Sequence, residues 1–340
     1  MKDKSQDTIW FDFTNPPHVN FFLPLIKHFS AKGSKTILTA REFVETVKLL
    51  EANNLEFDVY GKHGGRKKIN KIINLIYREI GLLLNVKSFD FSFSSNYEAP
   101  LASWLKSKKS LVFDDNDISP NWLYAKFAKY VISPSSINKE AMYKMGIRKN
   151  QLITYNGFKE DIYIADYIPD ERFFDKIPFT EFVTVRPENI EASYVPSGRE
   201  SIVKELVARL IKTGINVLYL PRYERDKAYV SENKRLFIPK EPLNGLDVCH
   251  YSTAVLTGAG TFSREAAVMG TPAVSFFAGE EFLGVDKKMF EKKMVYFTRD
   301  PANIVKYVTN SKKKTLDLNK SKLVQSELFE ILEQLLSEET

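Results

Sequence analysis

Strand-like and helix-like segments alternate along all 340 residues of this chain, and this alternation limits the folds open to it. Short apolar runs such as 8–13 and 254–256 are each followed by a longer segment whose apolar residues have helical spacing. Such chains build βαβ units with parallel strands. The chain is also long enough to bury two ordinary cores. We therefore expect an α/β protein with two doubly wound, Rossmann-like domains.

The expected domain boundary lies in segment 155–169, where Gly, Pro and acidic residues interrupt the periodicity. It separates an N-terminal domain, 1–160, from a C-terminal domain, 161–340, that includes a terminal helix after about residue 316. Two such domains would face each other across a cleft, with ligands at the carboxyl ends of the strands. Strands are expected at 8–13, 34–40, 56–60, 89–94, 110–113, 131–133, 152–155, 182–185, 216–220, 236–238, 254–256 and 273–276, and further helices at 20–32, 42–53, 69–84, 99–107 and 199–213.

Composition excludes several classes of protein. The hydrophobic fraction of 44% and the charged fraction of 27% are typical of a soluble globular chain. No apolar run approaches the roughly 20 residues of a membrane span, and no signal peptide is visible. The single Cys249 excludes an internal disulfide and fits a cytoplasmic location, and four histidines make a zinc site improbable. The net charge of +6 permits an anionic ligand, but no nucleic-acid-binding motif is present.

Segment 257–272 combines a strand end, two glycines and the start of a helix. Thr261 or Ser263 is placed to cap that helix, which Gly270 and Pro272 would end. Free amide N–H groups and the positive end of the helix dipole suit a phosphate, although such turns also occur in proteins that bind nothing there. The expected ligand-binding residues are Gly258, Gly260, Thr261, Phe262, Ser263 and Glu265.

A second candidate site follows the first strand, in a Pro-Pro loop that carries Asn15, His18 and Asn20. The unperturbed pKa of histidine, near 6.5, suits a general base, and the asparagines can donate to hydroxyl or phosphate oxygens. The alternative is a rigid turn in which His18 only caps the helix.

Carboxylates follow another strand, with Asp114 and Asp115 directly after segment 110–113. Crowding of like charges raises at least one pKa, which suits a proton donor or acceptor, whereas a solvated acidic turn would need no such role. Asn96 ends the strand before it and can hold an acceptor or cap a helix.

Two basic features complete the candidates. Arg186 ends the strand 182–185, where its planar fork can bind a diphosphate or form a structural ion pair. Segment 62–71 is basic and leads into the amphipathic stretch 69–84. That stretch is either a core helix after a solvated loop, which we favour, or a peripheral contact with anionic lipid through 62–84.

These motifs together resemble a microbial family known as a domain of unknown function, with an expected GT-B glycosyltransferase fold. The matching segments are 12–19, 61–65, 155–161, 185–188, 258–267 and 270–272, which span nearly the whole chain. More distantly, the chain is similar to lipid-linked N-acetylglucosaminyltransferases, whose ribose-binding glutamate corresponds to Glu265, and to UDP-N-acetylglucosamine 2-epimerases. In the latter a histidine precedes the arginine, where this chain has Val185.

The resemblance implies a glycosyltransferase that moves a sugar from a nucleotide-diphospho-sugar, UDP-linked, to a glycan or lipid-linked acceptor in surface polysaccharide or glycoconjugate synthesis. An epimerase on the same substrate and a non-catalytic nucleotide-sugar binder are the alternatives. Arg186 and the amides of 260–263 would hold the diphosphate, and His18, Asp114 or Asp115 would take the acceptor proton. The nucleotide-sugar enters as substrate, and neither a cofactor nor a metal is expected.

Overall fold

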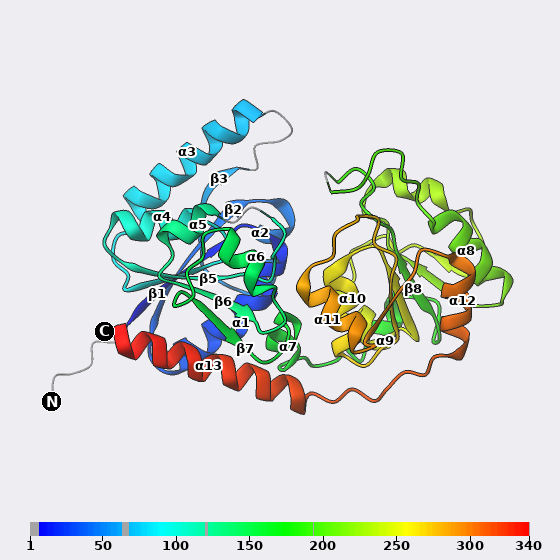
Figure 1. Cartoon of the computed structure of the whole chain (residues 1–340). Helices are drawn as coiled ribbons and strands as arrows, with labels where there is room; N and C mark the ends of the chain where they lie inside the picture. The colour runs from blue at the N-terminus through cyan, green and yellow to red at the C-terminus, as the bar shows by residue number, and fades with distance from the viewer. Residues whose placement is uncertain (1–6, 63–67, 120–121, 193, 340) are drawn as a thin grey trace. The chain divides into compact units, whose positions relative to one another are not determined.

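The computed structural model describes residues 7–62, 68–119, 122–192 and 194–339, which form two compact units (Figure 1). The first unit contains Met1–Tyr163 and Val324–Thr340, and the second contains Ile164–Leu323. Each unit is built around one parallel sheet, so the α/β class and the doubly wound architecture predicted from the alternation are confirmed.

The first sheet has the strand order β3-β2-β1-β4-β5-β6-β7, with every pairing parallel. The order reverses between β1 and β4, where doubly wound sheets bind ligands at the carboxyl ends of their strands. The strands are β1 (Thr8–Phe13), β2 (Lys35–Glu42), β3 (Asp58–Lys62), β4 (Phe91–Ser94), β5 (Lys109–Phe113), β6 (Tyr130–Pro134) and β7 (Leu152–Tyr155). The helices are α1 (Pro16–Ala31), α2 (Val44–Ala52), α3 (Lys68–Asn85), α4 (Glu98–Leu105), α5 (Trp122–Phe127), α6 (Lys139–Lys144), α7 (Lys159–Ile164) and α13 (Asn319–Glu339).

The alternation of side chains along β1 explains how this sheet separates its two faces. Phe11 contacts Phe22 of α1 and Phe93 of β4, so one face is an aromatic core under α1. Trp10 points to the opposite face and belongs to a cluster with Leu82 of α3 and residues of α4. Asp12 shares this second face and is also fully buried, because α3 supplies a charged partner for it.

The first helix begins at Pro16 rather than near residue 20, which corrects the predicted Pro-Pro loop. Proline fits the first helical turn because its missing N–H would have no acceptor inside the helix, and its φ is already helical. His18 therefore lies in the first turn of α1 and is held by the helix.

The C-terminal helix α13 packs on the first unit, whereas the sequence assigned it to the second domain. The His28 ring stacks on Phe329 at 3.9 Å, and its Nε2 lies 2.7 Å from Glu333. A Cβ on Gly157 would lie 2.3 Å from Val324, so this glycine permits the close approach of the helix.

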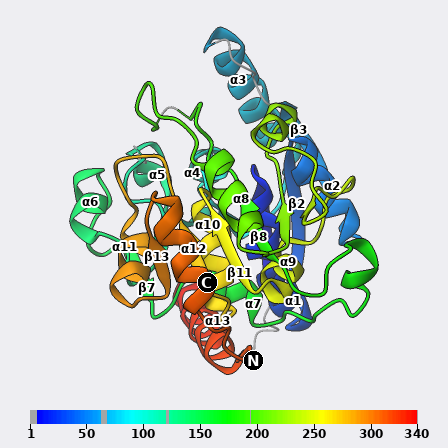
Figure 2. The same cartoon turned by 90° about the vertical axis from the view of Figure 1, so that its right-hand side faces the viewer.

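The second sheet has the order β10-β9-β8-β11-β12-β13, again parallel, with its reversal between β8 and β11. Helices α8 and α12 pack on one face, and α10 contacts α9 and α11 (Figures 1 and 2). The strands are β8 (Val183–Arg186), β9 (Val217–Tyr219), β10 (Leu236–Phe237), β11 (Ala254–Thr257), β12 (Ala273–Ser275) and β13 (Val295–Phe297). The helices are α8 (Val203–Lys212), α9 (Gly245–Tyr251), α10 (Gly260–Val268), α11 (Gly284–Glu291) and α12 (Pro301–Asn310), with 3-10 turns at Phe173–Lys176 and Glu224–Tyr229. Within the ranges described, no helix has both the length and the apolar character needed to cross a bilayer.

Candidate functional site

A polar pocket of about 240 Å³ lies at the carboxyl end of the first sheet. Residues after β1, β4 and β5 line it, so it lies at the reversal of strand order. Its lining residues are Asn15, Pro17, His18, Phe21, Ser95, Phe113, Asp114, Asp115, Asn116 and Lys159. The structure thus brings together four residues proposed from separate segments of the sequence, namely Asn15, His18, Asp114 and Asp115.

The two aspartates of this pocket have different surroundings. The Tyr124 hydroxyl donates to Asp114 Oδ2, and the Asn116 N–H donates to Oδ1 at 3.0 Å. Burial, together with the charge of Asp115, raises the pKa of Asp114 to about 7, against these hydrogen bonds. Asp115 pairs with the Lys159 ammonium at 2.8 Å. One carboxyl group is therefore suited to exchange a proton near neutral pH beside a charge-paired neighbour.

The His18 imidazole is a poor proton acceptor at neutral pH. Its Nδ1 lies 3.3 Å from the Thr14 hydroxyl. Burial, and after it the charge of Lys159, lower the pKa of His18 to about 3. The ring is therefore neutral and can act as a hydrogen-bonding group toward a ligand.

The three asparagine candidates have different positions. Asn15 lines the pocket and accepts a hydrogen bond from Arg41 at 3.3 Å. Asn20 lies farther along α1, and Asn96 follows β4; neither is among the described residues that line the pocket. Both amide atoms of Asn96 are buried without a hydrogen-bond partner.

A buried ionic cluster, not predicted from the sequence, lies on the other side of β1. Arg78 of α3 donates from Nη2 to both oxygens of Asp12, at 2.7 and 2.6 Å, and its Nε lies 3.7 Å from Glu98. Burial, with Glu98 as the largest nearby negative charge, raises the pKa of Glu79 to about 8. An arginine within the apolar pattern of 69–84 was the available signal for this cluster.

At the carboxyl end of the second sheet, Gly258 lies in close contact with the backbone of Glu188. A Cβ on Gly258 would lie 2.5 Å from the Glu188 Cα, so only glycine fits after β11. Glu188 is itself held by Ser201 at 2.7 Å and by Arg299 at 3.1 Å. This contact fixes the loop that leads into α10.

Helix α10 begins at Gly260, with Ala259 as its N-cap, so the predicted caps Thr261 and Ser263 are wrong. The Ser263 hydroxyl instead donates to the Gly260 carbonyl at 2.8 Å, inside the first turn. The Ala259 N–H bonds the Thr257 hydroxyl at 2.9 Å. The next three N–H groups, of residues 260–262, have no acceptor within a regular helix and are available to an anion.

Two arginines lie at the same carboxyl edge of the second sheet as this helix N-terminus. The Arg186 guanidinium carbon lies 5.9 Å from the centre of the Phe262 ring. Burial, and after it the charge of Arg222, lower the pKa of Arg186, whereas the buried Glu265 opposes them. Arg222 follows β9, and its Nε donates to the Pro187 carbonyl at 2.9 Å. Arg222 was not among the residues predicted from the sequence, although a basic residue soon after a predicted strand was the available signal.

Arg264 occupies the place of the third glycine in a dinucleotide-binding fingerprint and has a structural partner. Its guanidinium is buried and lies 2.8 Å from Asp286 of α11. This ion pair ties α10 to α11.

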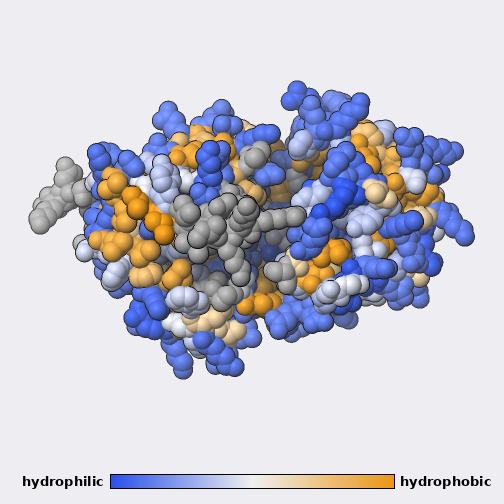
Figure 3. Space-filling view, turned by 90° about the horizontal axis from the view of Figure 1, so that it is seen from above, coloured by the Kyte–Doolittle hydropathy of each residue, from blue (hydrophilic) through white to orange (hydrophobic). Residues whose placement is uncertain are grey.

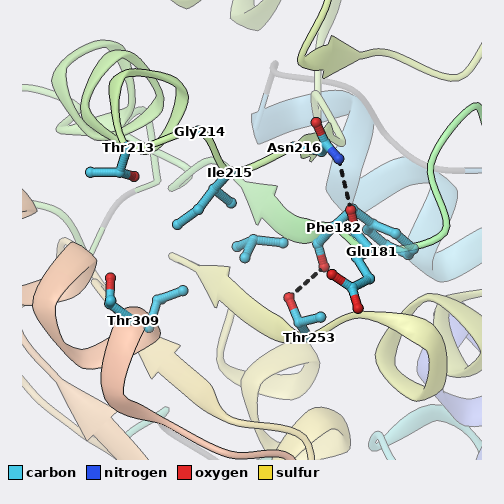
Figure 4. A pocket seen from close by; sticks show the side chains of 10 residues that line it. Glu181, Phe182, Thr213, Gly214, Ile215, Asn216, Thr253 and Thr309 are labelled. Carbon is cyan, nitrogen blue, oxygen red and sulfur yellow. Dashed lines mark hydrogen bonds between the residues drawn. The ribbon is translucent and has the colours of Figure 1, made fainter.

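A larger cavity of about 390 Å³ lies at the amino ends of the second sheet (Figure 4). Its polar side chains are engaged with the backbone, since Asn216 donates to the Glu181 carbonyl at 3.0 Å and Thr253 to the Phe182 carbonyl at 2.8 Å. Size alone therefore does not mark the candidate site. Among the residues that the structure describes, no group of three or more His, Cys, Asp or Glu is arranged to hold a metal ion.

Sequence comparison identifies the family. A family described as "Protein of unknown function (DUF354)" matches residues 7–338. The chain belongs to this family. The uncharacterized protein MJ0665 of Methanocaldococcus jannaschii is 29% identical over 317 residues, which cover 89% of this chain and 91% of that protein.

Solved structures with the same fold confirm the GT-B class expected from the resemblance. UDP-GlcNAc 2-epimerase of Methanocaldococcus jannaschii matches 96% of this chain and 99% of its own, with a TM-score of 0.71 and 15% identity. The Neisseria meningitidis enzyme bound to UDP-GlcNAc matches 95% and 100%, with a TM-score of 0.66 and 12% identity. A glycotransferase of kitacinnamycin matches 98% and 99%, with a TM-score of 0.64 and 10% identity. At these identities the likeness shows the fold alone.

Proposed function

We propose that this protein is a glycosyltransferase that takes its sugar from a nucleotide-diphospho-sugar, most simply a UDP-sugar. The observation that carries the proposal is the joint placement of Arg186, Arg222 and the α10 N-terminus in the second unit. Guanidinium forks bind phosphate oxygens in pairs, and free helix amides add further donors. Structural neighbours are described as bound to UDP-GlcNAc, which supports the same class of ligand.

In the proposed donor complex, the diphosphate lies against the amides of residues 260–262 and the two arginines. These groups stabilise the negative charge that develops as the bond between the sugar and the diphosphate breaks. The buried carboxylate of Glu265 accepts hydrogen bonds from the ribose hydroxyls, as the resemblance implies. The leaving nucleotide diphosphate departs with the electron pair of the broken bond.

Asp114 is the proposed proton acceptor. The acceptor oxygen forms a bond to the anomeric carbon while its proton passes to the Asp114 carboxylate. A pKa of about 7 suits this step at cellular pH, because general bases work best near the operating pH. Asp115 stays paired with Lys159, and the neutral His18 and Asn15 orient the acceptor hydroxyl. The acceptor is a glycan or a lipid-linked saccharide.

An epimerase reaction on the same substrate is the second candidate, because several structural neighbours are UDP-GlcNAc 2-epimerases. The similar segment of that group has a histidine before its arginine, where this chain has the buried Val185. Val185 belongs to the hydrophobic core of the second unit, so this chain has no imidazole at that position, which favours transfer over epimerisation.

Product analysis with UDP-N-acetylglucosamine tests the proposal. A transferase consumes little donor alone and releases UDP when a suitable acceptor is added. An epimerase instead yields the C2 epimer, or a free sugar with UDP, without any acceptor. A rise in melting temperature with UDP but no consumption of any donor, across acceptors, would identify a non-catalytic binder.

A further inference from the structure

Helix α3 of the first unit presents its apolar face outward, which is the reverse of an ordinary surface helix. In α8, which has the same periodicity, Val203, Leu206 and Leu210 are completely buried. In α3, by contrast, Ile76 and Ile80 are each at least 50% exposed. Burying such a face is what normally stabilises an amphipathic helix in a protein.

The residues that fix α3 to the unit are a buried arginine, a glutamate, a glycine and one core leucine. Arg78 is only 2% exposed and pairs with Asp12, while both Glu79 carboxylate oxygens are buried. Gly81 lies against Tyr60, and Leu82 enters the core beside Trp10. This orientation corrects the core-helix interpretation that the sequence favoured. The Arg78–Asp12 pair selects the orientation, because turning the helix over would leave Asp12 buried without its partner.

The outward face therefore carries no charge over residues 74–85, since Arg78 and Glu79 both point inward. Hydrophobic residues gather over α3 in the view from above, next to hydrophilic ones (Figure 3). The exposed apolar residues of this face are Leu75, Ile76, Tyr77, Ile80 and Leu84. Together they form a contiguous apolar patch and not a single scattered hydrophobic residue, and such patches are typical of interaction surfaces.

Charge identifies the occupant of this face. The sequence of residues 62–71 contains five Lys or Arg and no acidic residue, and the exposed Lys87 follows the C-terminal end of α3. Residues 63–67 and the side chains of 68–73 lie outside what the structure describes, so their contribution here is one of composition. The neighbouring helices α4 and α5, which cover the same face of the sheet, expose Trp104 and Trp122, and Lys126 lies 5.0 Å from the Trp122 ring centre. Exposed aromatics beside lysines are typical of the membrane–water interface.

We propose that α3 docks the protein on an anionic lipid surface, with its outward face among the acyl chains and the exposed Lys87, just after the helix, at the head groups. An uncharged face of this length with flanking lysines matches interfacial helices, which bind through apolar burial and attraction to acidic lipid. The inference does not depend on the proposed glycosyl transfer.

Vesicle flotation of the full chain tests this inference. We expect the full chain to bind vesicles of phosphatidylcholine with about 30% phosphatidylglycerol at least tenfold more than vesicles of pure phosphatidylcholine. This binding should weaken as the salt concentration rises. Ile76→Glu with Ile80→Glu should abolish binding while the melting temperature is kept, because both side chains are already exposed. The matched control is Ile168→Glu, which changes an 84% exposed isoleucine of the second unit and should bind as the wild type does.

Three results would overturn the proposal. The first is no flotation with acidic vesicles, and the second is flotation that the double substitution leaves unchanged. The third is that the wild type does not bind vesicles but forms a dimer in sedimentation velocity, and that the double substitution dissociates this dimer. This result would assign the face to a second copy of the chain. Turnover of a nucleotide-sugar with a water-soluble acceptor should be the same in the double variant and the wild type, which separates this inference from the proposed function.

Discussion

The two units use the same order of parallel strands but place opposite charges at the carboxyl ends of those strands. In the first unit the pocket holds Asp114, Asp115 and an uncharged imidazole. In the second unit Arg186, Arg222 and the N-terminus of α10 lie at the corresponding place. The same strand order can thus carry either acidic or basic residues at this edge, because these residues belong to the loops after the strands. We expect the first unit to exchange protons and the second to bind an anion.

The largest expected effect is loss of turnover in Asp114→Asn, because an amide cannot accept the acceptor proton. Turnover should fall about a thousandfold, within the usual contribution of a general base. UDP binding should stay within twofold of the wild type, since the arginines belong to the other unit. Steady-state rates and calorimetric titration measure the two quantities. The control Asp58→Asn changes an exposed carboxylate of β3 and should leave both unchanged. Equal losses of binding and turnover in Asp114→Asn would contradict the division of roles.

The next effect concerns the ion pair that each unit buries. Arg78→Met should lower the free energy of unfolding of the first unit by about 3–5 kcal/mol, because Asp12 would remain buried without its partner. Arg264→Met should cost the second unit less, since the Asp286 side chain is 16% exposed and can be hydrated.

Tryptophan fluorescence during urea denaturation isolates the first of these effects, because Trp10, Trp104 and Trp122 all belong to the first unit. The control is Lys62→Met, which removes one side of the exposed pair with Glu42 and should cost at most about 1 kcal/mol. If Arg78→Met loses no more free energy of unfolding than the control, the pair of Asp12 and Arg78 does not fix α3.

The sequence predicted the strands except β13, and the edge of each sheet that carries the candidate residues, because these follow from local periodicity and from the topology of parallel sheets. It did not predict helices such as α9, α11 and α12. It did not predict which unit holds α13. The apolar spacing of Leu328, Leu332 and Leu335 requires a partner surface, but many surfaces would satisfy that requirement. Gly157 decides between them, and its role depends on one long-range contact with Val324.

The environments of the site side chains could not be predicted from the sequence either. The motif suggested His18 as a base from its ordinary pKa, yet burial in α1 and the charge of Lys159 lower that pKa strongly. Lys159 is distant in sequence, so no local pattern reveals the pair it forms with Asp115. The outward orientation of α3 depends in the same way on Asp12, which belongs to another element.

A smaller effect tests the anion-binding side of the comparison. Arg186→Ala and Arg222→Ala should each weaken UDP binding about tenfold or more, the usual value of a hydrogen bond to a charged group. Calorimetric titration at two salt concentrations should also show a weaker salt dependence in both variants. The control is Arg209→Ala on the exposed face of α8, paired with Glu205, which should bind UDP as the wild type does. Unchanged affinity in both arginine variants would place the nucleotide elsewhere.

The smallest effect separates the two titrating groups of the first unit by the sign of their pH dependence. The pKa of His18 is lower in the folded state, so the unfolded chain binds more protons below pH 6.5 and stability falls as the pH falls. The pKa of Asp114 is higher in the folded state, so its contribution to stability is lost as the pH rises from about 4 to about 7.

We compare the change in the free energy of unfolding when the pH is lowered from 7 to 5.5. This change should be about 1 kcal/mol more destabilising in the wild type than in His18→Asn, because only the wild type has the imidazole. It should be less destabilising in the wild type than in Asp114→Asn, because only the wild type gains from protonation of Asp114. Urea denaturation followed by tryptophan fluorescence at both pH values measures these differences. His18→Asn should also retain the decline of turnover below about pH 7, because that decline belongs to Asp114. If the decline disappears in His18→Asn and persists in Asp114→Asn, the imidazole is the proton acceptor and the carboxylate only supports it.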